Sequence, residues 1–412
     1  MGESPLVLGI DLGTSGIRVA VLDRQTTILH SQSSRYRTGL TQPEDWQQGC
    51  RELIRAIPEC MRSRLVALAV DGTSGTLLAC EANGTPISRA LRYSEAFPAH
   101  TEQLQQLVPE GGPAASSSSS LARGLRLMEQ YGQDLLLRHQ ADWLNGWLLN
   151  DWRWGEEGNN VRLGWDLERN AWLPGLIDQA WGQALPQICP SGSRLGLIDA
   201  ERANELDLPH QLQVIAGTTD SNAAVLAADP GDDDGITVLG TTLVMKRFTD
   251  RPIRGPGITL HRVGGRWLCG GASNAGGGVL SKLFDPSVLQ ELSRQIDPES
   301  DSGLCLRPYP GPGERFPVDN PNLQPVLEPR PVSDALYLHG LLEGLAEIEQ
   351  QGWRCLTELG APAPRRVISL GGGARNPQWR RLRERRLKIP VVSCFRPPAA
   401  GAARLALDAV AR

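Results

Sequence analysis

The same local pattern occurs once in each half of the chain: an apolar stretch, a glycine-hydroxyl turn, and a second apolar stretch that ends at an aspartate. In the first half the turn is Leu12–Ser15 and the pattern ends at Asp23; in the second the turn is Leu239–Thr242 and the pattern ends at Asp250. Internal similarity of this kind indicates that one supersecondary unit is used twice. The 412 residues are enough for two or three domains. We therefore expect two halves built on one plan.

The boundary between the halves is expected near residue 228. The segment Pro230–Gly235 is rich in aspartate and glycine, which is typical of a connection. The predicted domains are residues 1–228 and 229–412. The last helix, 401–412, is expected either within the second domain or packed back on the first.

Apolar strands alternate with helical patterns along the chain. Leu65–Val70 and Val367–Leu370 are short apolar runs in front of glycine turns, which favours strands. Leu121–Tyr131 and Ala335–Leu359 have apolar residues at helical spacing. The serine-rich stretch Ser116–Ser120 is interpreted as a loop that ends in a helix N-cap. The alternation predicts the α/β class.

Composition argues against several classes of function. The 42 Lys and Arg against 46 Asp and Glu leave a net charge of −4, whereas a nucleic-acid partner calls for an excess of basic residues. The eight cysteines show neither zinc-ligand spacing nor a Cys-x-x-Cys motif. No apolar run approaches the ~18 residues that span a bilayer, and the first residues carry no signal sequence. We expect a cytoplasmic protein without nucleic-acid or membrane partners.

The common nucleotide-binding motifs are absent, because the chain has neither a Gly-Lys pair for a Walker A loop nor a Gly-x-Gly-x-x-Gly string. Instead, four glycine-hydroxyl turns follow apolar strands, at 13–16, 72–75, 217–219 and 240–242. Such turns present backbone N–H groups and hydroxyls to an anion. Aspartates accompany two of these turns and would repel phosphate unless a divalent cation lay between them. The pattern predicts phosphate binding with Mg²⁺.

Asp11 and Asp220 are the candidate functional carboxylates. Asp11 lies within the first hairpin, where burying a carboxylate costs free energy unless it is paired or meets a metal. Asp220 follows the apolar strand that begins at Val214. Because Ser221 and Asn222 come next, the alternative role of Asp220 is that of a helix N-cap.

Four segments resemble, in the same order, motifs of the FGGY carbohydrate kinases, a family of the actin, hexokinase and Hsp70 superfamily. They are similar to the first phosphate loop, the catalytic-base segment, the second phosphate loop and the adenosine segment, and comprise Gly9–Ser15, Ala216–Asp220, Leu239–Thr242 and Leu370–Asn376. The resemblance covers nearly the whole chain. It implies two RNase-H-like domains with a nucleotide cleft between them, the first binding sugar and the second nucleotide.

Within the family, the strongest likeness is to a short cyanobacterial and plant branch of pentulose (ribulose or xylulose) kinases. Three further segments carry this likeness: Asp71–Thr76, Gly270–Asn274 and Gly313–Pro317.

The resemblance implies ATP and Mg²⁺ as cofactors and gives each motif residue a role. Asp220 is expected to be the general base, with Asp11 and Thr14 as further catalytic residues, and Asp11 and Asp220 are expected to hold the metal ion. The expected hydrogen-bond donors to the phosphates are Gly13, Thr14, Ser15, Gly240 and Thr241.

The adenosine segment is expected to contact the nucleoside. Gly372 and Gly373 would permit close approach of the backbone, and Asn376 would offer its amide to adenine. Trp379 is expected to stack on the adenine ring. Core packing is the alternative for Trp379, because the chain holds 11 Trp residues.

The substrate is expected to be a small sugar bound by Ser74, Asp11, Asp220 and Ser221. Glycerol is disfavoured, because Thr73 and Ser74 replace an Arg-Glu pair of the family's glycerol kinases. The family's Trp-x-Asp-x-Arg loop is also altered here, to Tyr93–Phe97.

The predicted activity is phosphorylation of the terminal hydroxyl of a pentulose by a monomer or homodimer. D-Ribulose is favoured and D-xylulose is the alternative. An actin- or Hsp70-like ATPase switch without a sugar acceptor is the competing hypothesis.

Overall fold

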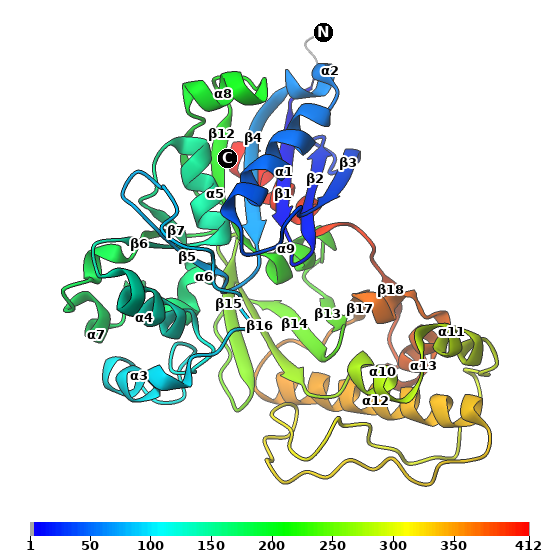
Figure 1. Cartoon of the computed structure of the whole chain (residues 1–412). Helices are drawn as coiled ribbons and strands as arrows, with labels where there is room; N and C mark the ends of the chain where they lie inside the picture. Colours follow the sequence, from blue (N-terminus) through cyan, green and yellow to red (C-terminus); the bar gives the residue numbers. More distant parts are fainter. Residues whose placement is uncertain (1–3, 412) are drawn as a thin grey trace. The chain divides into compact units, whose positions relative to one another are not determined.

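The computed structural model describes residues 4–411, which form two compact units (Figure 1). Unit 1 contains the chain up to Ala227, the short segment Arg262–Gly265 and the stretch from Arg396 onward. Unit 2 contains Ala228–His261 and Arg266–Phe395. The helix near the end of the chain, α14 (Pro398–Ala411), thus belongs to unit 1.

Each unit is built on a six-stranded sheet. The strand order in unit 1 is β11 (Arg194–Leu197), β12 (Gln213–Thr219), β4 (Leu65–Gly72), β1 (Leu6–Leu12), β2 (Gly16–Leu22) and β3 (Ile28–Arg35). The order in the second sheet is β15 (Ile258–Val263), β16 (Arg266–Ser273), β14 (Leu243–Thr249), β13 (Asp234–Leu239), β17 (Arg366–Leu370) and β18 (Val391–Ser393).

The two sheets share one plan. In unit 1 the strands β1, β2 and β3 are antiparallel, and β4 and β12 continue the sheet in parallel beyond β1. In unit 2 the strands β13, β14 and β16 are antiparallel, and β17 and β18 continue in parallel beyond β13. The repeated turn connects β1 to β2 and β13 to β14. The predicted repetition of one plan and the predicted α/β class are confirmed.

Strand β1 is buried along its whole length because helices cover both faces of its sheet. Its residues Leu8 and Ile10 belong to the core shared with α1 (Pro43–Ala56) and α5 (Gln140–Leu149). Val7, on the other face, packs with the alanines of α14. A Cβ on Gly9 would lie 1.8 Å from the carbonyl oxygen of Ala399, so only glycine lets α14 pack this closely.

The chain between β4 and β12 adds a smaller core to unit 1. It is formed around the hairpin of β5 (Leu77–Cys80) and β6 (Leu136–His139) and the helices α3 (Thr101–Leu107) and α4 (Ser120–Tyr131). Ser119 caps α4, since its hydroxyl accepts a 3.0 Å hydrogen bond from Ala122 N–H. The predicted N-cap at the end of the serine-rich loop is thus confirmed.

The remaining named helices and strands of unit 1 are short. They are α2 (Glu59–Arg62), β7 (Trp154–Glu156), α6 (Glu157–Asn160), β8 (Trp165–Asp166), β9 (Ala171–Trp172), α7 (Pro174–Ile177), β10 (Gln187–Cys189), α8 (Ala200–Leu206) and α9 (Asp220–Ala227).

Unit 2 is organised by the long helix α12 (Asp334–Glu358), with α10 (Gly277–Leu283), α11 (Pro286–Arg294) and α13 (Pro377–Leu387). Arg383 of α13 and Glu349 of α12 form a fully buried ion pair, with Arg383 Nη2 2.7 Å from Glu349 Oε1. Arg383 Nη1 also donates to the hydroxyl of Ser369 on β17 at 2.6 Å. This network joins two helices to the sheet. The proline-rich stretch 307–331 contains neither helix nor strand.

Two aspartates that matter for the site lie on strands, just before the glycine turns. Strand β1 extends to Leu12 and β4 to Gly72, so Asp11 and Asp71 are both strand residues.

All eight cysteines are free. No helix within residues 4–411 is long and apolar enough to cross a membrane.

Candidate active site

Three neighbouring strand ends in unit 1 carry aspartates. The strands β12, β4 and β1 are adjacent and parallel, so their carboxyl ends meet at one edge of the sheet. Asp11 lies near the end of β1 and Asp71 near the end of β4, and Asp220 follows β12 as the first residue of α9. The sequence prediction named the first and the third of these residues and missed Asp71.

Asp11 is 1 % exposed and is fixed by an arginine on the next strand. Arg18 Nη1 lies 2.9 Å from Asp11 Oδ2, and the two residues are cross-strand neighbours in β1 and β2. Burial raises the pKa of Asp11, while the neighbouring carboxyl group of Asp71 and the charge of Arg18 oppose this shift. The second oxygen, Oδ1, has no hydrogen-bond partner among the described residues. One oxygen of Asp11 therefore stays available for a further ligand.

Asp71 is fully buried and lies beside Asp11 in the register of the two parallel strands. Neither of its carboxylate oxygens receives a hydrogen bond from a donor within residues 4–411. Burial raises the pKa of Asp71 well above its ordinary value, and the negative charges of Asp11 and Asp220 raise it further. The closeness of the two carboxyl groups thus raises the pKa of Asp71 and opposes the rise in the pKa of Asp11.

The first phosphate turn follows β1 and leaves two hydroxyl residues exposed. Gly13 N–H donates to Gly16 C=O at 3.0 Å, which closes the turn around Thr14 and Ser15. A Cβ on Gly13 would lie 2.7 Å from Arg18 Nη1, so glycine leaves room for the arginine that holds Asp11. The exposed hydroxyls can donate to an anion in front of the turn.

The turn after β4 is held from behind by a buried glutamine. Gln140 Oε1 accepts hydrogen bonds from Thr73 N–H at 3.1 Å and from the Thr73 hydroxyl at 2.8 Å. Gln140 Nε2 donates to the hydroxyl of Tyr36, which in turn donates to Gly13 C=O at 2.9 Å. One chain of side chains thus fixes both turns. Ser74 is half-buried, and its hydroxyl makes no hydrogen bond to any other described residue.

Asp220 is the first residue of α9 rather than its cap. The residue before it, Thr219, takes the capping role, because its hydroxyl accepts a 3.4 Å hydrogen bond from Asn222 N–H. Asp220 is half-buried and Ser221 is exposed. A Cβ on Gly217 would lie 1.9 Å from Val70 C=O, so this glycine allows β12 to approach β4 closely. The arrangement places Asp220 at the accessible end of β12.

The aspartates fit a water-coordinated Mg²⁺ better than a protein-caged metal. In residues 4–411 no three His, Cys, Asp or Glu side chains converge to hold a metal ion. Mg²⁺ typically keeps several waters and uses one or two carboxylates plus substrate phosphates. The unpartnered Oδ1 of Asp11 matches that requirement.

The second phosphate turn lies in unit 2 between β13 and β14. Gly240 N–H donates to Thr242 C=O at 3.2 Å, and Thr241 is exposed. Gly277 N–H donates to Gly240 C=O at 2.9 Å, so the start of α10 supports the turn. A Cβ on Gly276 would lie 2.6 Å from Thr241 C=O, which explains the glycines at this contact.

The adenosine segment follows β17 and differs from expectation in two of its residues. Asn376 caps α13: its Oδ1 accepts from Trp379 N–H at 3.0 Å, while its Nδ2 donates to Ser293 at 2.9 Å. Trp379 is 2 % exposed, and its ring packs on Gly373 within the core of unit 2. Both side chains are thus occupied in holding unit 2 together. Gly372 faces open space, because a Cβ on this residue would meet no atom within 4 Å.

Known proteins similar to this chain are sugar kinases. A xylulose kinase of Lactococcus lactis is 24 % identical over 90 % of this chain and 81 % of its own length. An L-fuculokinase of Salmonella typhi is 23 % identical over 94 % of this chain and 89 % of its own. No protein-family model matches.

Solved structures of sugar kinases share the fold. The xylulose kinase from Rhodospirillum rubrum superposes with a TM-score of 0.81 at 21 % identity, over 97 % of this chain and 89 % of its own. A Plasmodium falciparum glycerol kinase with ADP superposes with a TM-score of 0.80 at 16 % identity, over 100 % of this chain and 90 % of its own. The chain is thus similar to sugar kinases over most of its length and shares their fold.

Two segments that resemble FGGY kinases and are distant in sequence form one structural unit here. The carboxylate of Glu314 accepts from the Ser273 hydroxyl at 2.6 Å and from Asn274 N–H at 2.9 Å. Arg315 Nε donates to Ala272 C=O at 2.8 Å, and the ring of Phe316 lies over Gly271. These contacts explain why Gly270–Asn274 and Gly313–Pro317 occur together. The sequence shows both segments but gives no sign that they meet.

Proposed function

We propose that this chain is a member of the FGGY family, an ATP- and Mg²⁺-dependent kinase that phosphorylates the terminal hydroxyl of a pentulose, with D-ribulose favoured. The observation that carries the proposal is the position of Asp11, Asp71 and Asp220 at the adjacent ends of β1, β4 and β12. Phosphoryl transfer depends mainly on positioning and charge stabilisation, and this edge supplies carboxylates beside a phosphate-binding turn.

Asp220 is the proposed general base. The terminal hydroxyl oxygen of the sugar bonds to the γ-phosphorus, the bond from phosphorus to the β–γ bridging oxygen breaks, and ADP leaves. The hydroxyl proton passes to the carboxylate of Asp220, which suffices as a base because the proton can leave late in a loose transition state. Position supports this role, since Asp220 lies half-buried at the end of β12, where its Oδ1 accepts a 2.7 Å hydrogen bond from Ser221 N–H.

The phosphates are proposed to be held by exposed hydroxyls on the two glycine turns, those of Thr14 and Ser15 on the first turn and that of Thr241 on the second. The N–H groups of Gly13 and Gly240, which the sequence also predicted as donors, instead close their own turns by bonding to Gly16 C=O and Thr242 C=O. Mg²⁺, held by Asp11 largely through water with Asp220 nearby, would neutralise charge on the β- and γ-phosphates. Gly372, where a Cβ would meet no atom within 4 Å, is the proposed point of approach of the nucleotide to the backbone, while the space beside Gly373 is filled by the Trp379 ring.

The sugar is proposed to bind at Ser74, Asp220 and Ser221. The Ser74 hydroxyl is half-buried and makes no hydrogen bond to a described residue, so it can orient a substrate hydroxyl. D-Xylulose is the second candidate, because several similar proteins are named xylulose kinases. The two ketoses differ at one stereocentre.

The test is ADP release with Mg-ATP across D-ribulose, D-xylulose, L-ribulose, L-xylulose, L-fuculose and glycerol, with a blank that contains no sugar. Strong stimulation by D-ribulose is the expected result, and stimulation by D-xylulose alone would select the second candidate. Slow hydrolysis that no sugar stimulates would reject the kinase and favour an ATPase switch.

A further inference from the structure

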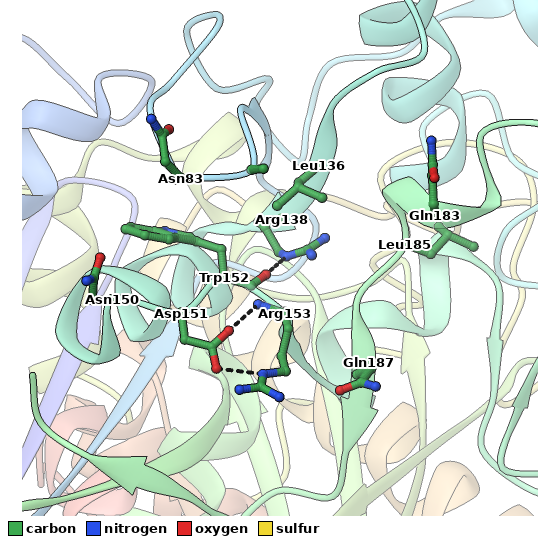
Figure 2. Close-up of a pocket in the computed structure, with 11 residues that line it drawn as sticks. Asn83, Leu136, Arg138, Asn150, Asp151, Trp152, Arg153, Gln183, Leu185 and Gln187 are labelled. Carbon is green, nitrogen blue, oxygen red and sulfur yellow. Dashed lines mark hydrogen bonds and ion pairs between the residues drawn. The ribbon is translucent and has the colours of Figure 1, made fainter.

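A surface cavity of about 590 Å³ lies in unit 1, among residues that the proposed phosphoryl transfer does not use (Figure 2). Its walls come from the turn after β5, from β6, from the loop after α5 and from the segment before β10. Its volume is within the range of small-molecule sites, about 300–1,000 Å³. The polar side chains on its walls include Asn83, Arg138, Asp151, Arg153, Gln183 and Gln187.

Arg138 is the feature of this cavity that indicates a ligand. Its side chain is 2 % exposed, yet its guanidinium bonds only to main-chain carbonyls: those of Trp152, of Leu137 at 2.7 Å and of Ala184 at 2.9 Å. Within the described chain no carboxylate forms an ion pair with Arg138, and its Nη2 makes no hydrogen bond. Figure 2 shows the guanidinium in the middle of the residues that line the cavity.

The charge of Arg138 persists at neutral pH. Burial lowers its pKa, but only to about 10. A buried cation without a paired anion is costly, so an anion that enters the cavity would recover part of that free energy. Guanidinium groups bind phosphate through parallel N–H donors, which makes phosphate the favoured anion.

The remaining charges of the cavity leave it positive. Asp151 is its one acidic residue, and its Oδ2 is paired with Arg153 Nε at 2.6 Å. Two arginines against one aspartate therefore line the site. Asn83 Oδ1 accepts from Thr85 N–H at 2.9 Å, which leaves its amide N–H groups for a ligand. Gln183 and Gln187 are exposed at the rim and can bind hydroxyls.

One wall of the cavity is rigid. The ring of Trp152 is packed so closely against two glycines that a Cβ would lie 2.0 Å from it at Gly84 and 2.2 Å from it at Gly146. A wall fixed in this way loses little conformational freedom when a ligand binds.

We propose that this cavity is a second binding site of the protein, specific for a small phosphorylated sugar whose phosphate bonds to Arg138 and Arg153 and whose hydroxyls bond to the amides of Asn83, Gln183 and Gln187. The site shares no residue with the proposed phosphoryl-transfer residues. It is connected to them through β6, because Arg138 lies two residues before Gln140, which holds Thr73.

The test is calorimetric titration of the full chain with D-ribulose 5-phosphate, inorganic phosphate and D-ribulose, without nucleotide. The wild-type protein should bind D-ribulose 5-phosphate more tightly than it binds inorganic phosphate or D-ribulose. Arg153→Ala and Gln187→Leu should each weaken this binding, Arg153→Ala by roughly tenfold. Arg126→Ala, which removes a half-buried arginine of α4 that does not line the cavity, is the matched control and should bind as wild type does.

Arg138→Met should abolish the binding, but it also removes three bonds to the backbone and could unfold the hairpin. The variants Arg153→Ala and Gln187→Leu therefore decide the outcome, because both side chains are exposed and their loss should leave the fold intact. Unchanged affinity in both rim variants would assign the binding to the phosphoryl-transfer residues and overturn the proposal. Equal affinity for inorganic phosphate and the phosphorylated sugar would overturn the sugar specificity.

Discussion

Asp71 and Asp11 are direct neighbours on two parallel strands, so that a fully buried carboxyl group lies beside the expected metal ligand. Two adjacent carboxylates resist carrying two charges, and here burial and repulsion raise the pKa of Asp71 well above its ordinary value, which favours its protonated form. A protonated Asp71 can donate a hydrogen bond to Asp11 and hold its carboxylate in one orientation. This makes Asp71 a positioning residue, which acts through Asp11.

Two substitutions of Asp71 should show whether its hydrogen-bond donor holds Asp11 in place. Asp71→Asn keeps an N–H donor toward Asp11 and should leave the Mg²⁺ concentration for half-maximal activity within about threefold of wild type. Asp71→Ala leaves Asp11 without that donor, and the loss of a hydrogen bond to a charged group should raise this concentration by roughly tenfold or more. Mg²⁺ titrations of sugar-dependent ADP release measure both. Equal behaviour of the two variants would reject the positioning role.

Substitution of Asp11 should change the response of the activity to Mg²⁺ more than substitution of Asp71 does. Asp11→Ala removes the carboxylate oxygen that stays unpartnered in the structure. The Mg²⁺ concentration for half-maximal activity should therefore rise by orders of magnitude. Thermal unfolding with Mg-ATP and with metal-free ATP gives a readout that does not depend on turnover. A wild-type response to Mg²⁺ in this variant would remove Asp11 from the metal site.

Asp220→Ala should lower sugar-dependent ADP release by about 10²–10⁴-fold, the usual contribution of a general base. ATP binding, followed by calorimetry, should be retained, because the phosphate donors lie on other residues. The conservative variant Asp220→Asn should be as inactive as Asp220→Ala, since the amide cannot accept the proton. Turnover near the wild-type rate in either variant would exclude the base role.

Glu156 should make stability depend on pH. Burial raises its pKa well above the ordinary value, and the charges of Glu157 and Asp142 raise it further. The folded state therefore binds this proton more tightly than the unfolded state. Its contribution to stability is complete below the unfolded pKa, about 4.5, and is lost as pH rises through the folded pKa.

Glu156→Gln mimics the protonated side chain and should reduce the loss of unfolding free energy between pH 5 and pH 8. Urea unfolding at the two pH values measures this difference. Glu102→Gln, at an exposed position on α3, is the control and should keep the wild-type dependence. An unchanged pH dependence in Glu156→Gln would show that the carboxyl group of Glu156 does not cause it.

Gly9→Ala should destabilise unit 1 by about 1–3 kcal/mol or more, because the new methyl group would overlap the backbone of α14 at Ala399. The free energy of unfolding from urea titration measures this. Gly311→Ala, where a Cβ would meet no atom within 4 Å, is the control and should be close to neutral. Comparable effects of the two substitutions would contradict the close contact between β1 and α14.

The sequence predicted those features that are local. The glycine turns at Gly13 and Gly240 are recognisable from their residue types, and the long helix expected over Ala335–Leu359 is found as α12. Pairing between strands is not local, and for this reason Asp71 was missed: its neighbour Asp11 is sixty residues away in sequence and one strand away in space. A signal was present, because an aspartate at the end of an apolar strand precedes a glycine turn at both positions.

In the adenosine segment the sequence predicted contacts that the side chains are not free to make. Asn376 and Trp379 match a motif, but a side chain's type does not reveal whether it is already engaged. Asn376 is bound to Ser293 and to the backbone of α13, and Trp379 fills the core behind Gly373. Whether Asn376 and Trp379 are engaged within unit 2 depends on the packing of α11 and α13, which the sequence does not show.

The place of α14 in unit 1 has a consequence for the order of events during synthesis. Residues 4–227 leave the ribosome early, but the alanines that cover Val7, Ala67 and Ile215 are made only when the chain reaches residues 399–409. Unit 2, which ends at Phe395, is complete before that helix exists. The half of the protein that is synthesised first should therefore be the last to acquire its final fold, and the aspartate-bearing edge of its sheet should mature only after nearly the whole chain has been made.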